Sequence, residues 1–139
     1  MLGPMKAPTA ARRLPKNHQV VYEIIRSAAH GVHLTTGDVF ALAKSKRPGI
    51  GFSTVYRGIQ RLRDLCLIDE VALPGADAAV YELASEPHAH FRCDACGAVE
   101  DVAFRLPARS AAKLAASTGA RIDQTKLTLH GLCRSCLQA

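Results

Sequence analysis

The sequence predicts an α+β fold in two parts: three helices and a hairpin, then a smaller unit of mixed strands and helix. Apolar residues recur at helical spacing in the first part and occur in short, strand-like runs in the second. Four of the five cysteines form two Cys-x-x-Cys pairs in the second part. Because about 50 residues bury too little apolar surface to fold well alone, we expect a metal, a partner subunit or both to stabilise this part.

The chain begins with a proline-, alanine- and arginine-rich stretch over 1–16, which we expect to be a mobile arm. Asn17 is the predicted N-cap of a first helix over 18–29, because its side chain can accept a hydrogen bond from a backbone N–H group of the first turn. A capping-box spacing that starts at Thr35 predicts a second helix over 36–46.

A third helix is predicted over 54–66, with Ser53 as its N-cap. Cys66 falls in the apolar phase of this helix, so we expect a small buried core residue there, with a reactive thiol as the alternative. Two strand-like runs, over 68–73 and 79–83, flank a Pro-Gly turn and predict a hairpin. Three helices followed by a hairpin are the layout of a winged helix-turn-helix.

The second part predicts strands over 88–93 and 98–103, a helix over 105–118 and a final strand over 121–130. This order of elements is typical of a small α/β unit. The last strand leads directly into the second cysteine pair.

The four paired cysteines predict a structural zinc site. Cys93 and Cys96 form one knuckle, Cys133 and Cys136 form the other, and 36 residues lie between the two. Two knuckles fill all four positions of a tetrahedron and leave no open coordination site. The alternatives are redox disulfides or ordinary buried thiols. A redox pair is disfavoured because the segment after Cys96 is strand-like, whereas a catalytic thiolate needs a helix N-terminus.

A second set of donors contains three imidazoles and two carboxylates but no thiolate. His88 and His90 alternate along a predicted strand, so their rings share one face. Asp101 lies on the next strand, Glu82 at the junction of the two parts, and His33 before the second helix. Such donors suit a divalent first-row metal with more than four ligands. Taken singly, each histidine has an ordinary surface or core position as its alternative.

Charge is distributed unevenly along the chain. Residues 1–63 carry a net charge of +9, residues 64–87 of −6 and residues 88–139 of +3. The basic first half is either a solvated face or a surface that binds a polyanion. No window approaches 18 apolar residues and no secretory signal is visible, so we expect a cytoplasmic protein that does not enter a membrane.

These motifs together resemble the ferric uptake regulator (Fur) family of bacterial metal-responsive transcriptional regulators. The matching stretches follow the family's order and are His33–Asp38, Arg47–Arg57, Tyr81–Glu82, His88–Gly97 and His130–Cys136. The resemblance implies a winged-helix DNA-binding domain with a basic arm over 1–84 and an α/β dimerisation and metal-binding domain over 85–139. It also implies a homodimer that binds double-stranded operator DNA as a repressor.

The resemblance further implies that the four paired cysteines hold structural zinc. It implies a regulatory metal site made of His33, Glu82, His88, His90 and Asp101. Fe²⁺ or Mn²⁺ suits these ligands, and a zinc-uptake-type zinc sensor is the alternative within the family. Asp101 and the six-residue step from Glu82 to His88 resemble the peroxide-sensing branch.

The third helix is expected to enter the major groove of DNA. Tyr56 and Arg57 are the candidates for base contacts, since arginine can bind guanine with two hydrogen bonds and tyrosine can touch a thymine methyl group. Packing at the helix edge is the alternative for Tyr56. The candidates for phosphate contacts, which position the protein without specifying sequence, are Arg13, Lys16, Ser53, Thr54 and Arg61.

The competing class of function is a thiol-dependent or metal-dependent enzyme. The histidine and carboxylate set could hold a hydrolytic metal. We predict no enzyme and no small organic substrate, because the sequence shows no nucleophile–base pair and no glycine-rich phosphate loop. A hydrolase would also have no need of the basic first half.

Overall fold

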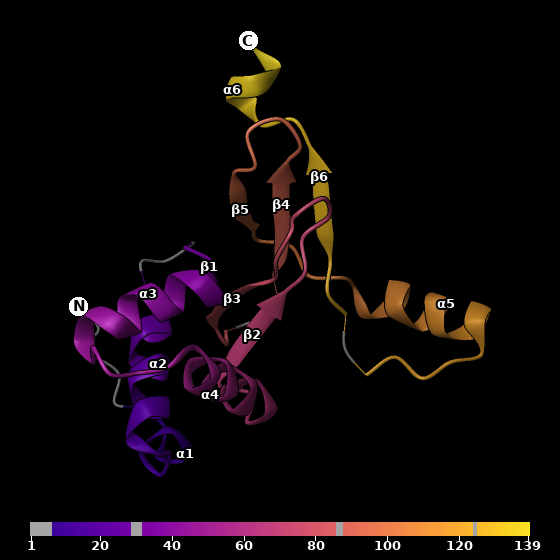
Figure 1. Cartoon of the computed structure of the whole chain (residues 1–139). Coiled ribbons are helices and arrows are strands. Elements are labelled where there is room, and N and C mark those ends of the chain that lie inside the picture. Colours follow the sequence, from indigo (N-terminus) through magenta and orange to yellow (C-terminus); the bar gives the residue numbers. More distant parts are fainter. Residues whose placement is uncertain (1–6, 29–31, 86–87, 124) are drawn as a thin grey trace, which may run out of the picture. The chain divides into compact units, whose positions relative to one another are not determined.

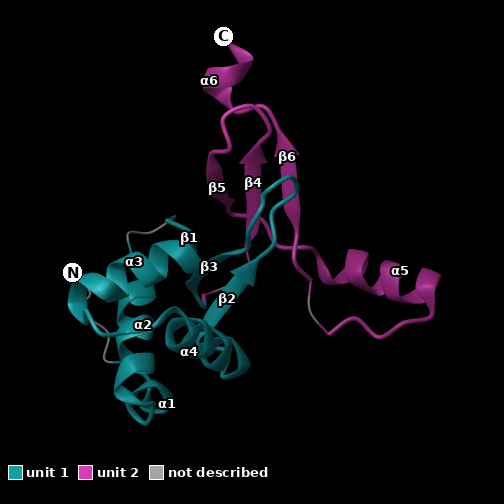
Figure 2. Cartoon of the chain, viewed as in Figure 1, with its two compact units in different colours: residues 1–84 teal, residues 85–139 magenta. Residues whose placement is uncertain are grey.

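The computed structural model describes residues 7–28, 32–85, 88–123 and 125–139. The chain divides into two compact units, Met1–Ala84 and Ser85–Ala139 (Figure 2). None of the helices in the described ranges combines the length and apolar character needed to span a membrane.

Among its described residues, the first unit contains the three predicted helices, the predicted hairpin and two elements that were not predicted, a short helix and a short strand that joins the hairpin in an antiparallel sheet (Figure 1). The helices are α1 (Thr9–Arg12), α2 (Lys16–Ser27), α3 (Thr36–Lys46) and α4 (Phe52–Asp64). The strands lie in the order β1-β3-β2 and are β1 (Leu34–Thr35), β2 (Ile68–Val71) and β3 (Val80–Leu83).

The core of the first unit lies between α2 and α4. Both helices direct buried aliphatic side chains into it, namely Val21, Ile24, Ile25, Val55, Ile59 and Leu62. Each such side chain contributes about 1.5–3 kcal/mol when it is removed from water. Because this face of α4 is used for packing, the opposite face is left to meet solvent.

Helix α3 begins as predicted. The Asp38 N–H donates to Thr35 Oγ1 over 3.1 Å, and the Thr35 N–H donates to Asp38 Oδ2 over 3.0 Å, which completes the capping box. These reciprocal bonds satisfy two backbone donors that the first turn leaves without intrahelical partners.

The predicted N-caps of the other two helices are wrong. Helix α2 begins earlier, because Pro15 is its N-cap and accepts the Gln19 N–H at 2.9 Å, so Asn17 lies inside the first turn. Helix α4 begins after Gly51, and Ser53 is likewise inside the helix. In both cases the preceding extended residue starts the helix through its carbonyl, with no side-chain cap.

The predicted mobile arm is folded where the structure describes it. Helix α1 lies within it, and Ala11 and Leu14 are only 2% and 7% exposed in the core of the first unit. The apolar residues of the arm therefore anchor it. Residues 1–6 lie outside the described part of the chain.

Cys66 is not the buried core residue that its helical phase predicts. Helix α4 stops at Asp64, and Cys66 is exposed with a φ of 58°. The Cys66 N–H donates to Arg63 O at 2.9 Å and the Leu67 N–H to Leu62 O at 3.0 Å. This pattern is a Schellman motif, in which the left-handed position normally belongs to glycine.

The second unit has a three-stranded sheet in the order β5-β4-β6. Its elements are β4 (Ala89–Cys93), β5 (Val99–Val102), α5 (Ala108–Thr118), β6 (Thr128–Gly131) and α6 (Arg134–Leu137). Strand β4 is central, antiparallel to β5 and parallel to β6. Helix α5 has no buried residue and stands away from this sheet (Figure 1).

Two predicted elements of the second unit are shorter in the structure. The helix predicted over 105–118 begins only at Ala108, since Pro107 has an extended backbone and acts as its N-cap. Of the strand predicted over 121–130, the described residues form only β6, whose residues find partners on β4, and residue 124 lies outside the described part of the chain. Helix α6 was not expected from the sequence.

Candidate metal centres and nucleic-acid interface

The four paired cysteines converge at one end of the second unit. Cys93 ends β4, Cys96 lies in the following turn, and Cys133 and Cys136 lie at the start of and within α6. Their sulfur atoms all lie within 4.8 Å of one another, and Cys96 Sγ is 3.8 Å from Cys133 Sγ. Tetrahedral Zn–S bonds require sulfur separations of about 3.8 Å, so this set fits a zinc ion.

The electrostatics of this cluster favour a bound cation. Backbone N–H groups of Cys96 and Cys133 lower the pKa of Cys93 to about 6, and the latter group is 3.3 Å from its sulfur. The neighbouring sulfurs of Cys133, Cys93 and Cys96 raise the pKa of Cys136 to about 12. Four thiolates therefore ionise together only when a positive ion compensates them.

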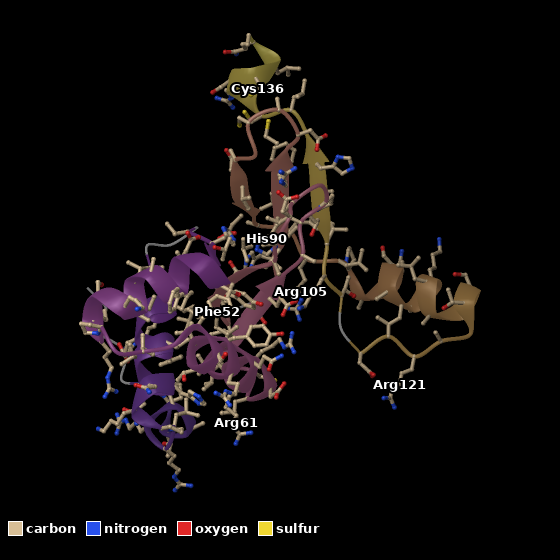
Figure 3. The ribbon with its side chains drawn as sticks, in the orientation of Figure 1. Phe52, Arg61, His90, Arg105, Arg121 and Cys136 are labelled. Atoms are coloured by element: carbon tan, nitrogen blue, oxygen red, sulfur yellow. The ribbon has the colours of Figure 1, made fainter. Side chains whose placement is uncertain are left out.

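Three members of the second donor set meet within the second unit. His90 faces Asp101 across the β4–β5 ladder, and the rings of His88 and His90 have centroids 4.6 Å apart. Asp101 Oδ1 lies 3.6 Å from His88 Nε2 and 3.5 Å from His90 Nε2. Figure 3 marks His90 on β4. Two imidazoles and a carboxylate at these distances could supply part of the coordination of a metal ion.

The other two members meet within the first unit. His33 immediately precedes β1, and Glu82 lies on β3, which pairs with β1 through Leu34 and Tyr81. His33 Nε2 is 2.9 Å from Glu82 Oε2, and their side chains are only 3% and 11% exposed. Antiparallel register thus brings together two donors that are 49 positions apart in the sequence.

The candidate base-contacting residues lie on the exposed face of α4. Tyr56 is 45% exposed. Its hydroxyl accepts a hydrogen bond from Gln60 Nε2 at 3.1 Å. Arg57 Nε donates to Ser53 O at 3.3 Å, which orients the guanidinium while its Nη groups keep their own donors.

The candidate phosphate contacts divide between α4 and the arm. Ser53 and Arg61 are exposed on α4, and Thr54 is half-buried there. Figure 3 marks Arg61 on this helix. Arg13 and Lys16 are exposed beside the junction of α1 and α2.

His18 connects the start of α2 to α4, a role that the sequence analysis missed. Its ring lies against Gly58, where an added Cβ would meet His18 Cδ2 at 3.2 Å. Burial, followed by the positive charges of Arg57 and Arg61, lowers the pKa of His18. The sequence signal for this contact is Gly58, a glycine within a predicted helix, because a glycine permits close approach of another helix.

A sequence profile of the ferric uptake regulator family matches residues 10–130. The chain belongs to this family. The ferric uptake regulation protein of Bacillus subtilis (strain 168) is 34% identical to this Fur-family chain over 108 residues, covering 75% of this chain and 72% of that protein. The peroxide operon regulator of the same organism is 25% identical over 130 residues, covering 92% and 86%.

Solved structures of the Fur family share the fold. A ferric uptake regulator from Francisella tularensis with iron has a TM-score of 0.71 and 24% identity, covering 90% of this chain and 94% of that one. A zinc uptake regulator complexed with zinc and DNA has a TM-score of 0.67 and 23% identity, covering 91% and 84%. Fur-family proteins are regulatory transcription factors rather than enzymes.

Proposed function

We propose that this protein is a metal-dependent, DNA-binding transcriptional repressor that senses a divalent metal through His33, Glu82, His88, His90 and Asp101. The observation that carries the proposal is the division of these donors between the two units. The first unit holds an imidazole–carboxylate pair, and the second holds two imidazoles and a carboxylate. Each group is incomplete for an ion that takes five or six ligands.

An ion bound by both groups would favour one orientation of the first unit relative to the second. If that orientation fits operator DNA, metal binding and DNA binding become coupled, and each strengthens the other by the same factor. A coupling free energy of about 3 kcal/mol would change operator affinity roughly a hundredfold. The residues of this chain supply the donors, and the ion supplies the positive charge that joins them.

The proposed DNA interface is the exposed face of α4 together with the basic arm. Tyr56 and Arg57 would contact base edges in the major groove. The cations and hydroxyls of Arg13, Lys16, Ser53, Thr54 and Arg61 would contact phosphates. The net charge of +9 over residues 1–63 supports this assignment, because phosphate contacts dominate the affinity of DNA-binding proteins.

The second unit is proposed to form a homodimer and to hold structural zinc on its four paired cysteines. Its described residues expose several large apolar side chains, among them Phe104, Leu114 and Ile122. Helix α5 buries none of its residues within the chain. A second copy of the unit would remove this apolar surface from water.

We infer Fe²⁺ or Mn²⁺ as the sensed ion, with Zn²⁺ as the alternative. Histidine and carboxylate donors suit all three ions, and Zn²⁺ binds most tightly on intrinsic affinity. A response to peroxide is the finer hypothesis. It is supported by Asp101 and by the relative named as a peroxide operon regulator.

The test is DNA binding measured by fluorescence anisotropy, with a duplex selected from a random-sequence library in the presence of Mn²⁺. We expect affinity to rise roughly a hundredfold with Fe²⁺ under anaerobic conditions or with Mn²⁺. His90→Ala should abolish this rise, whereas His130→Ala, which removes an exposed histidine outside the donor set, should retain it. Equal affinity with and without metal would contradict the proposal.

The peroxide hypothesis requires a separate measurement. The Fe²⁺ form is treated with stoichiometric peroxide and its peptides are weighed. Addition of one oxygen atom to the peptide containing His33, or to that containing His88 and His90, with loss of DNA binding, would support it. Unmodified peptides and unchanged DNA binding would leave a sensor of metal alone.

A further inference from the structure

We propose that Gln19 is a positioning residue that holds Arg13 in place to contact a DNA phosphate. The inference rests on the proposed DNA-binding function and extends it to a side chain that touches no DNA itself. Gln19 Nε2 donates to Arg12 O at 3.1 Å and to Leu14 O at 2.7 Å. These two carbonyls lie on either side of Arg13.

One side-chain amide therefore binds the peptide group that precedes Arg13 and the peptide group that follows Leu14. A glutamine NH₂ group has two donors, and both are used here. The carbonyls at the end of a short helix have no intrahelical partners, so α1 depends on side chains or water to satisfy them. Gln19, in the first turn of α2, donates the hydrogen bonds that these carbonyls need, and its own backbone N–H is bonded to Pro15 O.

The other contacts of the backbone around Arg13 also hold it in place, and they leave the Arg13 side chain exposed to solvent. Ala11 and Leu14 are buried in the core on either side of it. The Arg13 N–H donates to Ala10 O at 3.3 Å, while the side chain is exposed. The arginine is thus attached to a rigid segment and extends into solvent, as a preorganised phosphate contact requires.

The surroundings of Arg13 within the first unit are strongly basic. The sequence has no acidic residue before Glu23, and it carries Arg12, Arg13 and Lys16 in this interval. One residue before Gln19, the His18 ring lies against Gly58 of α4. Arg57 and Arg61 flank that glycine on α4, so the arm and the proposed recognition helix contribute to one region of positive charge.

Without Gln19, Arg13 keeps its charge but loses its fixed position. A free arm must lose conformational entropy each time it binds, and this opposes the contact. We expect Gln19→Met, which keeps the side-chain length and removes both donors, to weaken DNA binding about tenfold at low salt. The slope of log K against log salt should fall by about 0.9, the contribution of one phosphate contact.

The experiment is a double-mutant cycle in the full-length protein, with anisotropy measured over a range of salt concentrations. The variants are Gln19→Met, Arg13→Ala and their combination, with Arg61→Ala as the matched background. Gln19→Met should have no further effect in the Arg13→Ala protein, but its full effect in the Arg61→Ala protein. This difference separates positioning of Arg13 from a general loss of structure, which would weaken binding in both backgrounds.

Equal losses in both backgrounds, or an unchanged salt slope in Gln19→Met, would overturn the inference. Thermal unfolding, followed by tyrosine fluorescence, identifies any variant that fails to fold. If Gln19→Met fails to fold, Gln19→Lys, which keeps a hydrogen-bond donor at this position, should retain part of the DNA binding. If the wild-type protein shows no salt-dependent DNA binding, the proposed function fails instead. Wild-type binding without an effect of Gln19→Met rejects only the role of Gln19.

Discussion

Replacing Cys66 by glycine should stabilise the first unit. Cys66 has a φ of 58° at the end of α4, and it is the one described residue other than glycine with a positive φ. Its side chain is exposed, so little apolar burial is lost when it is removed. The two Schellman hydrogen bonds involve backbone atoms alone, and glycine can form both of them.

The magnitude follows from two opposing effects. A left-handed conformation costs a residue with a Cβ atom about 1–2 kcal/mol, and glycine avoids this cost. Glycine also has greater backbone freedom in the unfolded chain, which destabilises the fold by about 0.4–1 kcal/mol. The net gain in the free energy of unfolding is about 0.8 kcal/mol, equivalent to a rise in Tm of roughly 3–6 °C for a unit of this size.

Tyrosine fluorescence measures this gain in the full-length protein. The chain has three tyrosines and no tryptophan, and Tyr22, Tyr56 and Tyr81 all lie in the first unit. Unfolding is followed in a reducing buffer, with Cys66→Ala as the control that removes the thiol but keeps the Cβ atom. If Cys66→Gly is no more stable than Cys66→Ala, the argument from backbone conformation is refuted.

Three further predictions concern other parts of the chain. Cys93→Ser should release one zinc ion per chain, measured with a chromogenic chelator, while Cys66→Ser should keep it; a zinc-bound Cys93→Ser protein would contradict the site. Gly58→Ala should destabilise the first unit by about 1 kcal/mol, since overpacking of about 1–3 kcal/mol exceeds the gain in helix propensity. Gly49→Ala, with no atom within 4 Å of the added Cβ, should show no such loss in the same tyrosine unfolding assay. Stability should fall as the pH drops below about 6.5, because burial lowers the pKa of His18 in the folded state and the unfolded chain then binds the proton more readily. His18→Leu should show a shallower fall between about pH 7.5 and about pH 5.5 in urea unfolding, and an unchanged fall would show that His18 is not responsible.

Periodicity and local capping predicted the fold class and most elements. The Thr35 capping box was correct because both of its hydrogen bonds are made within four residues. The N-caps assigned to Asn17 and Ser53 were wrong, since the preceding Pro15 and Gly51 start the helices through their carbonyls. Local sequence does not distinguish a capping side chain from one placed two residues inside the helix.

The prediction that Cys66 is buried was wrong for a different reason. Helical phase predicted burial, but the helix ends before this residue, and no glycine marks the left-handed position. The folded arm was missed for a related reason. Burial of Ala11 and Leu14 depends on a tertiary surface that a stretch rich in proline, alanine and arginine does not reveal.

The donor groups could be predicted only in part. Strand alternation placed His88 and His90 on one face, and the β4–β5 register then added Asp101. The approach of His33 to Glu82 depends on β1, a two-residue strand that no periodicity could indicate. The cysteine cluster was the easiest donor group to predict from the sequence, because the two cysteines of each knuckle lie close together along the chain.

The parallel pairing of β4 with β6 affects how the second unit is made. Parallel strands need a long crossover, and here β6 and α6 are synthesised after β4, β5 and α5. Contacts between residues far apart in sequence form slowly, whereas the N-terminal unit can fold while translation continues. A nascent chain therefore has no complete cysteine cluster until Cys136 has been added. A ribosome that stops before the codon of Cys136 would release a folded first unit joined to an unfinished second one.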